Sequence, residues 1–593
     1  MKRFAIIPFL LITISLTAAP IGEKRAREIA ANFFSAAPKT RSGSAPTIEL
    51  EWAGFEMESA VPFDRPTRTR STEEVNDESL MYIYNRTDAK GFIIVAGDDC
   101  AKRNIIAFSY DNSFDTQDMA EGAQALLNAW CKDIADARVK GVKPAATRAT
   151  SSVGTIINTY DTAKWGQGKP FNNECPIIDN ERAITGCVAT ASAIICYYHR
   201  WPNNGVGSTG SYSYTKNGTS VSIPNNDLGR SYDYDKMIPS YKGSYTQEQG
   251  AAVAALMFDL GTATHMGYGA DSSGANITRM AKAMVNNFGY SKQLLYLVRE
   301  SYPDDIWWQM LRDNLKTYGP TYYRGRTTSD IGHAFLLDGY TDKDYFRVNY
   351  GHNGSSDGFY YLPSISYCDQ QRAMFNLTPD RDGTSTYKHC LTLGTKTISG
   401  VLYKGIHTDA LDYYTGAVIQ CFIYPTNAGL STFKGHLCIA HCDKNGNIKR
   451  TLYMKNLIDS SLSSSGYNPT ITIRDKIENG DRLRVMYKGE NDSEWSYARR
   501  SSDSVTDEVL LCVSAESIAK NITIEYDKTN KSLTFTAPYA IQCSVYDSAG
   551  EVVASSKASA YNSASVDFSN LPSCEYKCSF SSNGDPYTIK LKF

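Results

Sequence analysis

The chain has 593 residues, with 61 Lys and Arg against 63 Asp and Glu, and its net charge is -2. A chain of this length exceeds what a single hydrophobic core supports, so we expect roughly three to five domains. The balanced charge gives no electrostatic reason to expect a nucleic-acid partner.

Residues 1–19 have the pattern of a secretory signal peptide. Lys2 and Arg3 precede an apolar run from Phe4 to Leu16, and small residues suited to cleavage follow at 17–19. The alternative, a membrane anchor, needs a longer apolar run and a stop-transfer flank. Because no other run is apolar for long enough, we expect a secreted, cell-surface or periplasmic protein without a transmembrane segment.

Residues 20–148 are predicted to form a small domain. Its expected elements are a helix over 25–36, three strands over 80–84, 92–96 and 105–110, and a second helix that contains Trp130. The basic stretch RVKGVKPAATRATSSVGT follows and has no periodicity. A stretch of this kind is typical of a linker that proteases reach easily.

Residues 149–378 are predicted to form an α+β domain, because helical patterns come first and an antiparallel sheet follows. The expected helices cover 187–198, 247–262, 277–287 and 305–318, and the expected strands cover 321–324, 333–340, 345–350 and 358–362.

Residues 379–514 and 515–593 show short strands with polar turns, which predicts two β-sandwich modules in which we identify no chemistry. Cys438, His441 and Cys442 come nearest to a zinc pattern, but the second half of such a site is missing. We therefore predict no metal and no cofactor.

Cys187 is the candidate nucleophile, in the stretch TGCVATASAIICYYHR. With Thr185 as the N-cap, Cys187 falls in the first turn of a helix, where the helix dipole favours a thiolate. Cys196 lies roughly 180° around that helix and is predicted to be an apolar filler. His199 lies about 18 Å further along the helix than Cys187, too far to act as its base.

His333 is the candidate base. It opens the apolar strand HAFLLDGY after a flexible segment, and it follows Cys187 by 146 residues. Asn349 and Tyr350 lie on the next strand across one turn, so either residue can orient the imidazole. Gln167, in WGQGKPFN ahead of Cys187, can donate its amide to an oxyanion.

Six segments together resemble the streptopain family of papain-like cysteine peptidases. They are WGQGKPFN, TGCVATASAIICYYHRWPNNG, DLGTATHMGYGADSSG, NNFGY, IGHAFLLDGY and RVNYGHNGSSDGF, in order over roughly residues 160–362. The 146-residue spacing also falls within the roughly 130–150 residues typical of papain-like enzymes. In the upstream domain, GFIIVAGDD and IIAFSYDNSFD resemble the streptopain prodomain.

The resemblance implies a secreted zymogen that hydrolyses polypeptides and whose prodomain acts as an intramolecular inhibitor. It maps the nucleophile onto Cys187, the base onto His333 and an oxyanion donor onto Gln167. The chain departs from the family at Tyr350 and His352, which stand where the family has two tryptophans.

Two alternatives remain open at this stage. One is a secreted papain-like binding protein without turnover, and the other is a transfer or amidase enzyme that uses the same nucleophile and base. Each candidate residue also has a structural interpretation: a buried thiol for Cys187, a core histidine for His333, a turn amide for Gln167 and a strand-end cap for Asn349.

Overall fold

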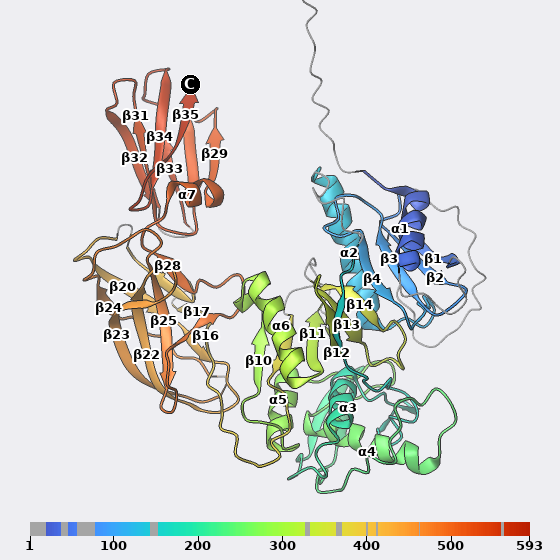
Figure 1. Ribbon diagram of the computed structural model, residues 1–593. Coiled ribbons are helices and arrows are strands. Elements are labelled where there is room, and N and C mark those ends of the chain that lie inside the picture. Colours follow the sequence, from blue (N-terminus) through green and yellow to red (C-terminus); the bar gives the residue numbers. More distant parts are fainter. Residues whose placement is uncertain are drawn as a thin grey trace, which may run out of the picture. The chain divides into compact units, whose positions relative to one another are not determined.

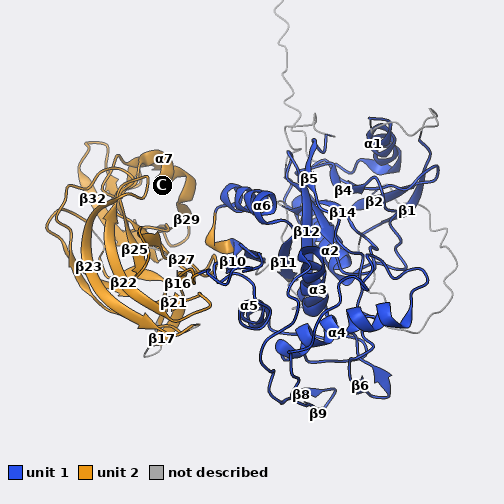
Figure 2. Cartoon of the chain, turned by 60° about the horizontal axis from the view of Figure 1, so that its bottom comes forward, with its two compact units in different colours: residues 1–299, 303–385 blue, residues 300–302, 386–593 orange. Residues whose placement is uncertain are grey.

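The computed structural model describes residues 19–36, 46–55, 78–142, 152–326, 332–362, 371–398, 401–410, 413–461, 463–558 and 562–592. Most of the predicted signal peptide, 1–18, and the centre of the predicted linker, 143–151, lie outside the described residues. The chain divides into two compact units, residues 1–299 with 303–385 and residues 300–302 with 386–593 (Figure 2).

The N-terminal part of the first unit places two helices beside four antiparallel strands (Figure 1). Helix α1 buries Ala26, Ile29, Ala30 and Phe33, which the helical period puts on one face. Both predicted helices and all three predicted strands are confirmed, and β1 was not predicted. The elements are α1 (Gly22–Ala36), β1 (Ile48–Gly54), β2 (Met81–Arg86), β3 (Phe92–Ala96), β4 (Ile105–Ser109) and α2 (Glu121–Val139).

The α+β prediction for the following region is confirmed, with each helix bound within one residue of its expected place. Helix α4 begins with a capping box, in which the Thr246 and Gln249 side chains each accept from the other's backbone N–H. The helices are α3 (Cys187–His199), α4 (Gln247–Ala263), α5 (Ile277–Asn286) and α6 (Asp304–Tyr318). The strands are β5 (Ile156–Thr159), β6 (Ile177–Ile178), β7 (Glu181–Arg182), β8 (Tyr212–Lys216), β9 (Thr219–Ile223), β10 (Leu295–Val298), β11 (Thr321–Arg326), β12 (Gly332–Thr341), β13 (Tyr345–Asn349), β14 (Gly358–Tyr361) and β15 (Arg372–Phe375).

One sheet runs through the whole first unit, in the order β1-β2-β3-β4-β14-β13-β12-β11-β15-β10, with β5 paired to β12. The strands of residues 20–148 join it through β4 and β14, where Phe108 lies opposite Phe359 and Ala107 opposite Tyr360. The Phe108 and Phe359 rings stack with centroids 5.0 Å apart. The two predicted domains of this unit therefore share a sheet and a core.

The second unit is almost entirely β, as predicted. Among its described residues, one hydrophobic cluster contains Leu437 and Leu483, a second contains Phe535 and Phe580, and a smaller third contains Cys438 and Met486. Helix α7 occupies the segment where the sequence predicted a module boundary, and its Ile518 belongs to the second cluster. The elements are β16 (Leu391–Leu393), β17 (Thr395–Ile398), β18 (Val401–Lys404), β19 (Ile406–Thr408), β20 (Val418–Ile423), β21 (Pro425–Asn427), β22 (Phe433–Cys442), β23 (Ile448–Asp459), β24 (Thr470–Thr472), β25 (Arg482–Gly489), β26 (Ser496–Tyr497), β27 (Arg499–Arg500), β28 (Glu508–Leu510), α7 (Ala515–Asn521), β29 (Thr523–Asp527), β30 (Ser532–Thr536), β31 (Ile541–Tyr546), β32 (Val552–Ala558), β33 (Ser563–Asp567), β34 (Glu575–Ser581) and β35 (Tyr587–Lys592).

Candidate active site

Cys187 is the first residue of α3 and is partly exposed. The N-cap is Gly186, with φ 84°, so the prediction of Thr185 as the cap is wrong. A side chain at Gly186 would lie 2.8 Å from Met266, and the left-handed backbone also favours glycine there. The Thr185 hydroxyl instead lies 2.8 Å from that of Thr190. Because helix N-terminal N–H groups lack intrahelical acceptors, the Cys187 sulfur lies in the positive field that the sequence predicted.

His333 lies near the start of β12 and is buried. It is hydrogen-bonded to the Cys187 thiol, which α3 brings to the sheet by packing against β12. Its Nε2 atom lies 3.1 Å from the carbonyl oxygen of Tyr350. With Nε2 held there, Nδ1 is the ring nitrogen left for the thiol.

The pKa values of the pair shift in opposite directions. Burial raises the pKa of the Cys187 thiol, but the hydrogen bond and charge of His333, with the backbone of Ala334, lower it below its ordinary value. Burial lowers the pKa of His333, but Cys187, the Tyr350 carbonyl and the charge of Glu121 raise it above its ordinary value. Both shifts favour a thiolate paired with an imidazolium.

Gln167 is half-buried, and its backbone carbonyl oxygen accepts a hydrogen bond from the Thr185 N–H at 3.1 Å. This bond ties the Gln167 segment to the chain that enters α3, so the two lie side by side at the helix N-terminus.

Asn349 is the last residue of β13, and its side chain hydrogen-bonds to two backbone groups and to one hydroxyl. Its amide nitrogen donates to the Thr162 hydroxyl at 2.9 Å and to the Ala163 carbonyl at 3.0 Å. Its side-chain oxygen accepts from the Gly351 N–H at 3.0 Å. These contacts hold the turn that carries Tyr350, and the contact with His333 comes from the Tyr350 carbonyl itself.

The other two candidates of the opening stretch lie away from this pair. Cys196 is buried, and burial raises the pKa of its thiol to about 12. The Nδ1 atom of His199 lies 3.1 Å from the Tyr290 hydroxyl, and burial lowers the pKa of His199 to about 4. Neither residue contributes to the environment of Cys187.

The N-terminus of α2 packs directly on His333, which the sequence did not predict. A side chain added at Gly122 would lie 2.4 Å from Cδ2 of His333 and 3.0 Å from the Tyr350 ring. The charge of the preceding residue, Glu121, raises the pKa of both Cys187 and His333. A glycine in a helical pattern is the only sequence signal at this contact, and it does not identify what approaches the helix.

The segment before α2 contacts the loop of residues 350–357, which connects β13 to β14. Asp118 Oδ1 lies 3.1 Å from Nε2 of His352, and the Asn112 amide donates to the Gly354 carbonyl at 2.8 Å. The Ala120 N–H donates to the Ser356 hydroxyl at 3.3 Å. The loop that holds His333 is therefore also a docking surface for the N-terminal part of the unit.

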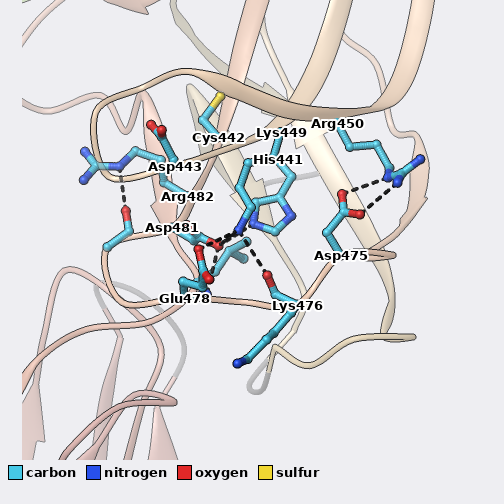
Figure 3. A network of polar contacts seen from close by, with 12 residues as sticks. His441, Cys442, Asp443, Lys449, Arg450, Asp475, Lys476, Glu478, Asp481 and Arg482 are labelled. Atoms are coloured by element: carbon cyan, nitrogen blue, oxygen red, sulfur yellow. Dashed lines mark hydrogen bonds and ion pairs between the residues drawn. The ribbon is translucent and has the colours of Figure 1, made fainter.

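The second unit holds a buried polar cluster around Asp481 (Figure 3). Asp481 Oδ2 lies 2.8 Å from Nε2 of His441 and 2.8 Å from Nζ of Lys449. The Glu478 N–H donates to the same oxygen at 2.9 Å. Across the described ranges, no group of three or more His, Cys, Asp or Glu residues is arranged to hold a metal ion. The cluster joins β22, β23 and the turn before β25.

Comparisons with known proteins match the same regions. The sequence model of the Peptidase C10 family matches residues 165–360, and that of the Spi protease inhibitor family matches residues 18–134. Streptopain from Streptococcus pyogenes is 29% identical over 363 residues, which are 58% of this chain and 85% of streptopain. The thiol protease/hemagglutinin PrtT from Porphyromonas gingivalis is 28% identical over 378 residues, 61% of this chain but only 41% of PrtT.

Two solved structures from Prevotella intermedia are also similar. A fragment of prointerpain A is 28% identical, covers 51% of this chain and 96% of its own, and has a TM-score of 0.42. Active interpain A cysteine protease is 32% identical, covers 38% of this chain and 95% of its own, and has a TM-score of 0.35.

A helix that presents a cysteine to a sheet that presents a histidine is the architecture of a papain-like cysteine peptidase. The chain belongs to the Peptidase C10 family, with a segment of the Spi protease inhibitor family ahead of the peptidase domain. In the part of the chain that the structure describes, no helix is both long and apolar enough to span a membrane.

Proposed function

We propose that this protein is a secreted cysteine endopeptidase, made as a zymogen, in which Cys187 is the nucleophile and His333 the base. The observation that carries the proposal is the hydrogen-bonded pair with opposite pKa shifts, because a thiolate is the reactive form of cysteine. The N-terminal pattern of residues 1–19 supports export.

In the acylation step, the Cys187 thiolate attacks the carbonyl carbon of a peptide bond and forms a tetrahedral oxyanion. The Cys187 N–H and the Gln167 side-chain amide stabilise that oxyanion. The C–N bond then breaks, the imidazolium of His333 gives its proton to the leaving amine, and a thioester to Cys187 remains.

In the deacylation step, neutral His333 takes a proton from water as the water oxygen attacks the thioester carbonyl. The C–S bond breaks and the carboxylic acid product leaves. The thiolate and the imidazolium are both restored, which closes the cycle without a metal or a cofactor.

Residues 20–148 act as the inhibitory prodomain in this proposal. Gly122 lies against His333, where a substrate must approach the pair. The predicted cleavage region lies between α2, which packs on the site, and β5, which pairs with β12 of the peptidase sheet. Cleavage there falls after the end of α2 at Val139 and before the start of β5 at Ile156.

The experiment incubates the purified full-length chain with denatured casein and follows both proteins by gel and mass spectrometry. We expect casein loss together with a new N-terminus between Lys140 and Ser152. Cys187→Ala should abolish both, and Cys196→Ala is the matched control, because its buried thiol faces away from the pair.

Three results distinguish the alternatives. Casein hydrolysis that persists in Cys187→Ala contradicts the assignment of the nucleophile. A full-length chain that is inert and whose Cys187 resists iodoacetamide favours a binding protein. Acyl transfer to an added amine without peptide hydrolysis favours a transferase on the same scaffold.

A further inference from the structure

The loop of residues 350–357 is closed by one buried carboxylate. Asp357 is 5% exposed, and its Oδ1 atom accepts from the Tyr350 N–H at 3.0 Å. Between these residues, Asn353 and Ser356 have φ values of 53° and 63°, a left-handed backbone that is unfavourable for side chains other than glycine. A loop with this conformation needs interactions that hold it, and the bond from Tyr350 to Asp357 joins its two ends.

The same loop holds the imidazole. The Tyr350 carbonyl accepts from Nε2 of His333, and the next peptide N–H, that of Gly351, donates to Asn349. Asp357 therefore fixes the N–H of Tyr350. The Asn349 side chain fixes the N–H of Gly351, which belongs to the same peptide unit as the Tyr350 carbonyl. A shift of the loop would move the only acceptor that the described contacts give to Nε2 of His333.

We propose that Asp357 is a positioning residue for His333, because it holds Tyr350 so that the Tyr350 carbonyl fixes the imidazole with Nδ1 toward Cys187. Asp357 does not touch the reacting atoms and acts through the backbone. The inference rests on the proposed function, because it concerns the step in which His333 transfers a proton.

The surroundings of Asp357 support this role. Burial raises the pKa of its carboxyl to about 7, with a further increase from Asp338 on β12, against the Tyr350 N–H, Arg347 on β13 and Lys164. A carboxyl that is buried beside another carboxyl contributes poorly to stability, and perturbed groups of this kind concentrate at functional sites.

The test compares three full-length chains, wild type, Asp357→Ala and Asp357→Asn. Each is processed with a trace of wild-type enzyme, and peptide hydrolysis is measured per mole of iodoacetamide-titrated Cys187. Asn keeps a side-chain oxygen that can accept from Tyr350, whereas Ala removes the acceptor. Asp259→Asn is the control for loss of a buried carboxylate elsewhere, because Asp259 bonds to Arg230, Tyr232 and Asn226.

Asp357→Ala should lower kcat by on the order of 10- to 100-fold with little change in KM, because a misplaced reacting group slows the chemical step. Asp357→Asn should restore most of that loss, and Asp259→Asn should leave kcat per titrated site unchanged. If Asp357→Ala does not fold, Asp357→Val fills the same space without an oxygen and takes its place.

The inference is overturned if the variant without the acceptor, Asp357→Ala or Asp357→Val, has a kcat within twofold of wild type. It is also overturned if Asp357→Asn and the control Asp259→Asn lose as much kcat as that variant. Cys187→Ala is measured beside them. If it keeps hydrolysis, the proposed function fails; if it is inactive while Asp357→Ala is fully active, only the inference about Asp357 fails.

Discussion

At the scale of single residues, two cysteines on helix α3 differ in protonation: the surroundings of one favour the thiol, and those of the other favour the thiolate. Cys196 is fully buried, and burial raises the pKa of its thiol to about 12 despite a hydrogen bond from the Tyr290 hydroxyl. Cys187 lies at the first turn of the same helix and has His333 as a partner, so its pKa falls despite burial. Neither charge of the pair would be stable alone in this site, because each compensates for the desolvation of the other.

The pH dependence of Cys187 alkylation follows from this pairing. Only the thiolate reacts with iodoacetamide, and a lowered pKa keeps the thiolate present as the pH falls below the ordinary thiol value of 9.0. In His333→Asn the effect of burial persists without the imidazolium, so the inflection should move up. Labelling at pH 7 should then slow about tenfold or more, since each pKa unit is worth a factor of ten.

Iodoacetamide labelling of the full-length chain across pH 5 to 10, read by mass spectrometry of the Cys187 peptide, measures this shift. Cys196→Ala should leave the profile unchanged. An inflection at the same pH with and without His333 would contradict the ion pair.

At the scale of elements, inhibition depends on how α2 and β4 attach to the peptidase sheet. Strand β4 adds to β14, and the first turn of α2 lies on His333. The hydrogen bond between Asp118 and His352 is exposed to solvent, so it contributes at most about 1 kcal/mol. The close contact at Gly122 should therefore matter more for docking than this hydrogen bond.

Gly122→Ala tests the contact. The added methyl group would lie 2.4 Å from Cδ2 of His333, and overpacking of this kind costs about 1–3 kcal/mol. This cost destabilises only the state in which α2 is packed on the site. Casein hydrolysis by the uncleaved full-length chain should therefore rise roughly 5- to 150-fold. The mature enzyme should have the wild-type kcat, because α2 has been removed from it.

Gly243→Ala is the matched control, since a side chain there meets no atom within 4 Å. Equal casein hydrolysis by the uncleaved Gly122→Ala and wild-type chains would show that α2 does not limit access to Cys187 and His333.

At the scale of the whole molecule, the second unit has its own hydrophobic clusters and its own buried charges. Asp481 is 1% exposed, forms an ion pair with Lys449 and is hydrogen-bonded to His441. Burial raises the pKa of Asp481, but the bonds from Lys449, the Glu478 N–H and His441 outweigh it and leave the pKa below its ordinary value. A lowered folded-state pKa means stability that is present above the unfolded pKa of about 3.9 and lost as the pH falls through the folded value.

Asp481→Asn should destabilise this unit by about 1–3 kcal/mol at pH 7, because it removes the charged acceptor of the Lys449, Glu478 N–H and His441 hydrogen bonds and leaves Lys449 with Glu478 as its carboxylate partner. The difference from wild type should shrink as the pH falls below about 4, the unfolded pKa, and through the lowered pKa of the folded wild-type carboxyl. Hydrogen exchange of β22 and β25 peptides in urea, at pH 7 and below about pH 4, measures the unfolding free energy of this unit.

Asp475→Asn is the control, because its bidentate pair with Arg450 is exposed to solvent and should contribute little to stability. Equal stability of Asp481→Asn and wild type at pH 7 would rule out a stabilising role for the cluster.

The sequence alone determined six of the seven described helices, fewer than half of the described strands, and the two residue types that carry the proposed chemistry. Helical periods placed α1 to α6, and the short pattern around Cys187 placed that thiol at a helix start. These signals are local, because a helix or a strand face is set by residues a few positions apart. In the first unit the same reasoning missed β1, β5 to β10 and β15, which are short, have few apolar residues or lie between stronger patterns.

Only the tertiary structure decided what meets at the site. The Cys187–His333 contact spans 146 residues and depends on how α3 packs against β12. The Tyr350 carbonyl that holds His333 is a backbone group, which every residue carries and which no sequence pattern distinguishes. The packing of α2 on the imidazole follows from the pairing of β4 with β14. Long-range register is a property of the assembled sheet, so local sequence cannot encode it in a readable form.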